Sequence, residues 1–223
     1  MIGIRSKQLI GLIIIFIAIT EMVVIGLTSK YDDYISRYFK SIQGNKILDA
    51  VMITIASFGD NFTLVTLAII LTIIRRSRKM GMIFLITIMI LAILIIYIKP
   101  LVGRTLPPYT FQPALRLPNR FVLEDDSLVP FARNLSYPSN HVATATALAF
   151  IIGFEINRKS RIGGLLLWTF PVIVAIARMY LMQHYLADVI AGFVFGLIFS
   201  IILSNLMKLD QPFVMSRFKG EKG

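Results

Sequence analysis

Long runs of apolar residues with almost no charge are the feature that most restricts how this 223-residue chain can fold. A helix of about 20 such residues spans the hydrocarbon core of a bilayer. Inside that core every backbone amide needs a partner within the protein, which a helix supplies by itself. The hydrophobic share of 57% also exceeds the value of about 45–50% that is usual for soluble domains. We therefore predict an all-α, polytopic membrane protein.

The apolar runs predict six transmembrane helices that form one bundle. Gly59-Asp60-Asn61 breaks the second helix, and Asn61 can cap the part that follows. The third helix is expected to end at Lys99-Pro100, because proline disfavours helical geometry in the residue before it. Pro171 predicts a kink in the fifth helix. The predicted ranges are 9–28, 62–74 with residues before the break, 80–98, 140–156, 162–180 and 184–206.

A single integral-membrane domain is expected to cover residues 1–223, because one bundle of this size leaves no room for a second large domain. The residues that carry chemistry fall within about 60–205. After the first apolar run, aromatic and charged residues interleave, which predicts an interfacial amphipathic segment with an aromatic belt. These residues are Lys30, Tyr31, Asp32, Asp33, Tyr34, Arg37, Tyr38, Phe39 and Lys40.

The distribution of lysine and arginine predicts the orientation in the membrane. The amino end, residues 75–79, residues 158–161 and the tail hold thirteen of the 23 Lys and Arg residues, and only three acidic residues lie in or next to them. Six spans put both termini on one side, and the positive-inside rule makes that side cytoplasmic. The net charge of +11 then reflects basic loops on anionic headgroups and not nucleic-acid binding. The predicted location is the cell (plasma) membrane, crossed several times.

Seven polar residues at predicted helix ends all fall on the opposite, outer side of the membrane. Charged groups at this depth are costly, so their clustering indicates a functional site. The set includes the only two histidines of the chain. The residues are Lys99, Arg104, Ser139, His141, Arg178, His184 and Asp188.

These side chains have the composition of a site for phosphoryl transfer. His184 and Asp188 lie four residues apart at a helix start, so the carboxylate can accept the Nδ1–H and leave Nε2 as a nucleophile or base. His141 lies near the amino end of another helix, where free N–H groups favour a phosphate. Three cations add to the attraction for an anion. Each residue alone could equally be structural, as a helix cap, a snorkelling anchor or a hydrogen-bonded pair.

A metal centre is the other interpretation of two histidines and nearby acids. Zinc needs a third close ligand and usually shows a helical spacing such as His-Glu-x-x-His. That spacing does not occur, and the chain has no cysteine for thiolate ligands or disulfides. The residues therefore disfavour a metal site, and we expect no cofactor.

The polar residues form three motifs that resemble those of the type 2 phosphatidic acid phosphatase superfamily of membrane phosphatases. The family patterns are Lys-x6-Arg-Pro, Pro-Ser-Gly-His and Ser-Arg-x5-His-x3-Asp. Together the three motifs are a specific signal, although each alone would be weak. This chain has Lys99-Pro100-Leu101-Val102-Gly103-Arg104-Thr105-Leu106-Pro107, Pro138-Ser139-Asn140-His141 and Ala177-Arg178-x5-His184-x3-Asp188.

Three positions depart from the family pattern. Leu106 stands where the first motif has its arginine, Asn140 replaces a glycine, and Ala177 replaces a serine. Family members often carry a second arginine at the position of Arg104, so this residue could hold the phosphate alone. The histidines and the aspartate are intact, and activity is therefore expected.

The resemblance implies metal-independent hydrolysis through a phosphohistidine. It implies that His184 is the nucleophile, that Asp188 orients it, and that His141 protonates the leaving oxygen and then helps water to attack. It also implies which residues hold the phosphate. These are Lys99, Arg104, Ser139, Asn140 and Arg178.

The expected substrate is a lipid phosphate or pyrophosphate in the bilayer, because the predicted site opens at headgroup level. Analogy with carrier-recycling members favours a polyprenyl pyrophosphate of the undecaprenyl or dolichyl type. Phosphatidate, phosphatidylglycerol phosphate and lipid A are alternative substrates. From other classes, a transporter or a lipid-binding protein without activity is the alternative. Transport is disfavoured because the polar residues cluster at one face and do not cross the membrane. The oligomeric state is left open.

Overall fold

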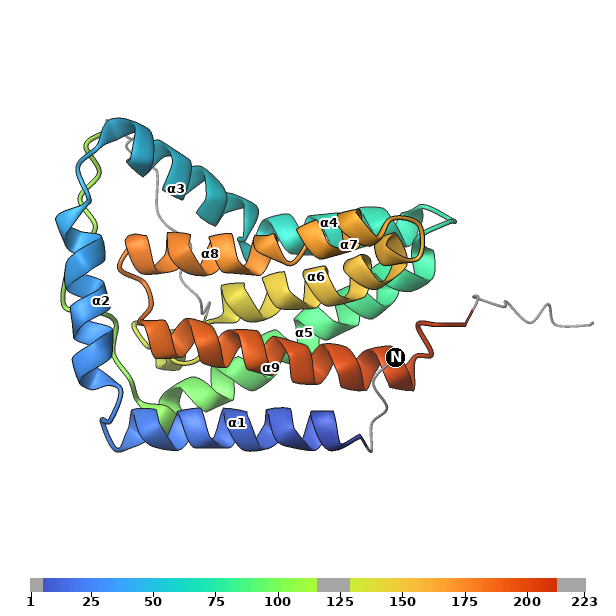
Figure 1. The fold of residues 1–223 in the computed structure, drawn as a ribbon, viewed down its shortest axis with the longest axis horizontal. Coiled ribbons are helices and arrows are strands. Elements are labelled where there is room, and N and C mark those ends of the chain that lie inside the picture. The colour runs from blue at the N-terminus through green and yellow to red at the C-terminus, as the bar shows by residue number, and fades with distance from the viewer. Residues whose placement is uncertain (1–5, 116–128, 212–223) are drawn as a thin grey trace, which may run out of the picture.

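The computed structural model describes residues 6–115 and 129–211. Within these ranges the chain is entirely helical apart from its loops and a single β-bridge (Figure 1). The long helices run side by side, and α2 lies across one end of the bundle (Figure 1). The elements are α1 Lys7–Val24, α2 Ser29–Ser41, α3 Lys46–Phe58, α4 Asn61–Ile73, α5 Arg78–Val102, the 3-10 turn Pro130–Ala132, α6 Asn140–Asn157, α7 Arg161–Leu166, α8 Thr169–Tyr180 and α9 Leu186–Leu206.

The prediction of an all-α membrane protein is confirmed. Among the described residues four stretches are long and apolar enough to span a bilayer, and the bent pair α3–α4 makes a fifth. The four are α1, α5, the α7–α8 stretch and α9. Helix α6 also has 18 residues, but most of them are buried. Its side chains therefore do not need to be as apolar as side chains that face lipid. The count of six spans stays a prediction.

The break within the predicted second span is confirmed. Helices α3 and α4 meet at Gly59-Asp60 and are bent by 46° relative to each other. The prediction that Asn61 caps α4 is wrong, because Asp60 occupies the N-cap position. The Asp60 side chain makes no capping hydrogen bond, so the first turn of α4 lacks the side-chain partner that such a position usually supplies.

The structure bears on the predicted effects of two prolines. Helix α5 does not end at Lys99-Pro100 but continues to Val102, where Gly103 adopts a left-handed conformation with φ of 67° and terminates it. In the fifth span, Pro171 has no N–H to donate to the Leu167 carbonyl four residues back, and that carbonyl accepts the Phe170 N–H at 3.2 Å instead. The helix is interrupted there, between Leu166 and Thr169, where α7 ends and α8 begins, and the two together still form one apolar stretch long enough to span a bilayer.

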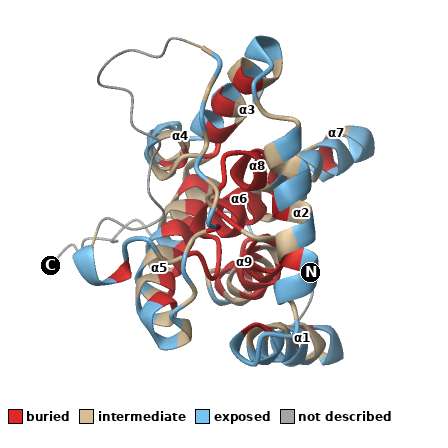
Figure 2. Ribbon diagram, turned by 90° about the vertical axis from the view of Figure 1, so that its left-hand side faces the viewer, coloured by how far each residue is buried: buried red, intermediate tan, exposed pale blue. Residues whose placement is uncertain are grey.

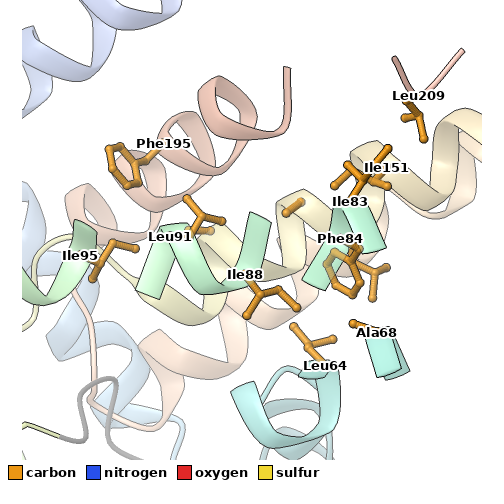
Figure 3. Close-up of a cluster of buried hydrophobic side chains, with 13 residues drawn as sticks. Leu64, Ala68, Ile83, Phe84, Ile88, Leu91, Ile95, Ile151, Phe195 and Leu209 are labelled. Carbon is orange, nitrogen blue, oxygen red and sulfur yellow. The ribbon is translucent and has the colours of Figure 1, made fainter. Parts of the chain in front are cut away.

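The central core joins α4, α5, α6 and α9 (Figure 3). Helices α6 and α9 are largely buried and α8 is buried at its carboxyl end, whereas α1 exposes most of its surface (Figure 2). In a membrane protein such exposed apolar residues face lipid and not water. The core residues are Leu64, Ala68, Ile83, Phe84, Ile88, Leu91, Ile95, Ala143, Ala147, Leu148, Ile151, Phe195 and Leu209.

Two glycines bring α9 directly against the backbone of α6. A Cβ on Gly192 would stand 2.4 Å from the Ser139 carbonyl oxygen, and a Cβ on Gly196 would stand 2.4 Å from the Ala143 carbonyl oxygen. Any larger residue would push the helices apart, as at other small-residue helix contacts in membranes. The position of α9 on α6 is therefore set by the main chain.

Replacing Gly196 with alanine is expected to lower the melting temperature in detergent, because the added methyl group must displace backbone. Such overpacking costs about 1–3 kcal/mol. Gly11→Ala is the matched control, since a Cβ at Gly11 in α1 has nothing within 4 Å. Alanine favours a helix over glycine by about 1 kcal/mol, so this variant should be at least as stable as the wild type. A Gly196→Ala protein that melts with the Gly11→Ala control would contradict the close contact.

Candidate active site

The predicted site residues meet at the end of the bundle that α2 covers. The carboxyl ends of α5 and α8 and the amino ends of α6 and α9 lie there (Figure 1). The basic loops at 75–79 and 158–161 lie at the opposite end, together with the end of α9 (Figure 1). Three motifs that are far apart in sequence therefore share one end of the molecule.

Most of these side chains are almost completely buried. Buried charges are costly unless they are paired or hydrogen-bonded, so the partners of each group define the site. Arg104 is the more accessible of the two arginines, with 14% of its side chain exposed. The residues with 3% exposure or less are Lys99, Ser139, Asn140, His141, Arg178, His184 and Asp188.

A backbone carbonyl fixes the orientation of the His184 ring. His184 Nδ1 lies 2.8 Å from the carbonyl oxygen of Ser136. A carbonyl can only accept, so Nδ1 carries a proton, and in the neutral ring Nε2 then carries the lone pair. The sequence predicted that Asp188 accepts this hydrogen bond, and that detail is wrong, because the nearest Asp188 oxygen is 3.8 Å from Nδ1. The predicted tautomer is obtained through a different group.

Asp188 instead connects the start of α9 to Arg104. Its Oδ2 accepts the backbone N–H of Tyr185 at 2.8 Å, and its Oδ1 accepts from Arg104 at 2.7 Å. The Arg104 guanidinium also stacks over the Tyr185 ring, 4.1 Å from the centroid. A carboxylate placed in this way fixes the turn that carries His184.

Arg104 is held by a second carboxylate, which comes from α2. Asp32 is 2% exposed, and its Oδ2 lies 2.5 Å from the other terminal nitrogen of Arg104. Its Oδ1 accepts the Ala187 backbone N–H at 3.0 Å. Burial lowers the pKa of Arg104, but Asp188 and Asp32 more than offset this effect and raise it above its ordinary value. Arg104 is therefore a permanent cation between two carboxylates.

Arg178 has its own set of acceptors at the end of α8. One terminal nitrogen donates to the Gln183 side chain, and the other donates to the Asp60 carboxylate and to the Ala56 carbonyl. The Asp60 oxygen that pairs with Arg178 lies 3.7 Å from Nε2 of His141. Asp60 thus brings the break between α3 and α4 into contact with two of the motifs.

The amino end of α6 completes the site. Ser139 is the N-cap of α6, and its backbone N–H donates to the Asp188 carbonyl at 3.1 Å. The Asn140 side chain donates to the Asn61 side chain at 3.1 Å. Lys99 donates to the Leu135 carbonyl in the loop that leads into α6. Hydrogen bonds therefore link the second motif to the third, and the loop before the second motif to the first.

Several residues of the site were not predicted from the sequence. Asp32 was assigned only to an interfacial segment, and Asp60 was identified only as part of a helix break. The Ser136 carbonyl belongs to the backbone and has no signal in the sequence. Aspartates next to apolar runs are the one sequence signal that could have indicated the two carboxylates.

The structure gives a physical reason for one departure from the family pattern. Ala177 is completely buried in an apolar cluster with Ile53, Ala56, Tyr180 and Leu181. A hydroxyl there would need a hydrogen-bond partner, whereas a methyl group packs without one. Leu106 lies in the loop after α5, where its backbone N–H donates to the Asn134 carbonyl at 3.3 Å. Nothing in the structure explains why a leucine stands at that position.

This arrangement can bind an anion and transfer a phosphoryl group. It offers a histidine with a lone pair on Nε2, a second histidine, two arginines, a lysine and the amino end of a helix. Within residues 6–115 and 129–211, no three His, Asp or Glu side chains are grouped so that they could hold a metal ion. The independence of the reaction from metal nevertheless stays a prediction.

Sequence comparison finds a family model and curated relatives. The PAP2 superfamily model matches residues 80–211. Undecaprenyl-diphosphatase BcrC of Bacillus subtilis is 29% identical over 181 residues, which cover 79% of this chain and 86% of the relative. An undecaprenyl-diphosphatase of Sulfolobus acidocaldarius is 28% identical over 160 residues, which cover 71% of each chain.

Solved structures share the fold. A crystal structure of a transmembrane PAP2 type phosphatidylglycerolphosphate phosphatase from Bacillus subtilis matches with a TM-score of 0.74 and 19% identity. The match covers 94% of this chain and all of the other. Aquifex aeolicus LpxE matches with a TM-score of 0.55 and 21% identity, over 76% of this chain and 92% of the other. These identities are too low to indicate more than a common fold.

Proposed function

The chain belongs to the PAP2 superfamily and is a membrane-embedded lipid phosphatase, and we propose that it hydrolyses a polyprenyl pyrophosphate through a phosphohistidine at the outer face of the membrane. The family match includes all three motifs. One observation supports the reaction type more than any other. The Ser136 carbonyl binds the His184 Nδ1–H and so leaves the lone pair on Nε2, the atom that must attack.

In the proposed reaction, His184 Nε2 attacks the terminal phosphorus while the bond from phosphorus to the leaving oxygen breaks. His141 gives its proton to that oxygen, and a phosphohistidine remains on His184. A water molecule then attacks the phosphohistidine and gives a proton to His141, and inorganic phosphate leaves. Asp188 positions the turn before α9 that carries His184, which supports its role as the orienting residue.

The proposed phosphate site combines Lys99, Arg178 and the amino end of α6, where Ser139 and Asn140 lie. These groups supply cations and backbone N–H donors for a group whose negative charge is spread over several oxygens. Arg104 is the remaining proposed ligand. Each of its terminal nitrogens already donates to a carboxylate, but each also carries a second N–H that can reach a phosphoryl oxygen.

The outer orientation follows from the positive-inside rule. The basic loops and the end of α9 lie at the end of the bundle opposite the site (Figure 1), so a cytoplasmic position for them would put the site outside and both termini inside. The plasma membrane is the proposed location. The names of the two curated relatives favour undecaprenyl pyrophosphate or a similar carrier lipid as the substrate.

Phosphate release from a panel of lipids in detergent tests this proposal. Polyprenyl pyrophosphate is expected to be hydrolysed faster than phosphatidate, phosphatidylglycerol phosphate or lipid A. Activity should be the same with EDTA, because the proposed reaction uses side chains and no metal. The His184→Ala protein serves as the blank. Preference for another lipid would overturn the substrate assignment, and a loss that only a divalent ion restores would overturn the metal-independent reaction.

A further inference from the structure

Asp60 lies between a buried arginine and the solvent. Arg178 is 1% exposed, whereas 24% of the Asp60 side chain is exposed. Other acceptors of Arg178 are the Gln183 side chain and the carbonyl of Ala56, a residue that is itself buried. Asp60 is thus a partly exposed acceptor, and an anion from outside can reach the guanidinium by taking its place.

The position of Asp60 is not explained by the helix that it begins. An aspartate at an N-cap usually accepts a hydrogen bond from the first turn of its own helix. Asp60 makes no such bond and directs its carboxylate at Arg178 instead. The same oxygen, Oδ1, that accepts from Arg178 lies 3.7 Å from His141 Nε2. A single anionic oxygen thus lies between a guanidinium and an imidazole.

We propose that the Asp60 carboxylate occupies the place of the substrate's phosphoryl group and is displaced when that group binds. This inference rests on the proposed function, in which Arg178 holds the phosphate and His141 faces the leaving oxygen. Carboxylate and phosphoryl oxygens both accept charge-assisted hydrogen bonds from a guanidinium. One group can therefore replace the other at Arg178 without leaving the buried cation unpaired.

The exchange makes Asp60 a determinant of which anions bind. An entering group must compete with a carboxylate that carries one negative charge. A terminal phosphate or pyrophosphate carries more charge than this and competes well, whereas a phosphodiester carries only one charge and competes poorly. The same competition favours release of inorganic phosphate after the reaction, because Asp60 returns to Arg178.

A model in which Asp60 only positions its neighbours predicts that phosphate affinity changes in the opposite direction. If Asp60 stays paired throughout the reaction and only positions Arg178 and His141, its removal would misplace both groups. Phosphate would then bind more weakly to an Asp60 variant than to the wild type. The affinity for phosphate therefore separates displacement from positioning.

The test is the binding of inorganic phosphate to the Asp60→Asn protein, measured in detergent as the rise in melting temperature with phosphate concentration. Chloride at equal ionic strength is the blank. The variant should bind phosphate at least about tenfold more tightly than the wild type, since an adjacent opposing charge commonly shifts such equilibria by this factor. Its rise in melting temperature should be correspondingly larger at each concentration. Equal or weaker binding would overturn the proposal.

Asp33→Asn is the matched control. It removes one negative charge from α2, at the same end of the bundle, but the Asp33 side chain pairs with Arg37 and Tyr109 and not with a residue of the proposed site. This variant should bind phosphate as the wild type does, and a gain equal to that of Asp60→Asn would overturn the proposal by showing a general charge effect. If Asp60→Asn does not fold in phosphate-free buffer, phosphate should restore the fold, and failure to do so would also contradict displacement.

Steady-state kinetics test whether the displacement of Asp60 also affects substrate binding and product inhibition. With Asp60→Asn, the KM for the lipid substrate and the inhibition constant of inorganic phosphate should both fall. A rise in either constant would indicate positioning and contradict displacement. Phosphate binding needs no hydrolysis, so a wild type that releases no phosphate from any lipid would defeat the proposed function separately from the binding result.

Discussion

The His184→Ala protein is expected to release no measurable phosphate from polyprenyl pyrophosphate while it remains folded. Alanine removes the proposed nucleophile, and loss of a nucleophile lowers turnover by at least about 1000-fold in comparable enzymes. His184 lies in the turn between α8 and α9, outside both helices. Alanine also removes the hydrogen bond to the Ser136 carbonyl, which contributes about 1 kcal/mol to the stability of the fold. Phosphate release and thermal unfolding in detergent measure the two effects.

Asp33→Asn controls for handling and detergent in this experiment, because its side chain is 41% exposed and pairs with Arg37 alone at short distance. It should keep the activity of the wild type. Turnover by His184→Ala at the rate of this control would show that another group attacks the phosphorus. A His184→Ala protein that no longer unfolds cooperatively would call for His184→Gln, for which the same loss of activity is expected.

The His141→Ala protein is expected to lose about 100-fold to 10,000-fold in turnover, the range typical of a missing general acid or base. His141 is also the proposed base for the attack of water, so hydrolysis of the phosphohistidine should slow as well. The intermediate should then accumulate. Rapid quenching in alkali, after incubation with substrate labelled in the terminal phosphate, measures the label on the protein.

The two histidine variants differ in what this trapping experiment should find. His141→Ala should carry label, whereas His184→Ala should carry none. Label on His184→Ala would assign the nucleophile to a different residue. Wild-type turnover by His141→Ala would remove the proton-transfer role that the resemblance implies.

The class of fold could be predicted because the bilayer imposes a simple rule on helix length and polarity. Where the prediction failed, local geometry had more influence than composition. Gly103 ends α5 three residues after Pro100, since a left-handed glycine caps a helix that a proline in its last turn does not stop.

The motif residues of the site could be predicted because their spacing follows the helices that carry them. Their partners could not. Asp32 reaches Arg104 only because α2 lies across the helix ends, and Asp60 reaches Arg178 only because α3 and α4 are bent at that residue. Both contacts depend on tertiary packing over more than 70 positions in sequence. A pattern search along the chain has no means of joining such residues.

The contact of Gly192 and Gly196 with the backbone of α6 has a consequence for how an enzyme of this kind can diversify. His141 lies at the start of α6 and His184 lies just before α9. The distance between these two reacting groups is therefore set by the contact between the main chains of the two helices. Such a contact has no rotamers to rearrange when a neighbouring side chain or the surrounding lipid changes. New lipid preferences would then arise from substitutions in α2, α3 and the loop after α5, while the relative positions of the two histidines stay constant.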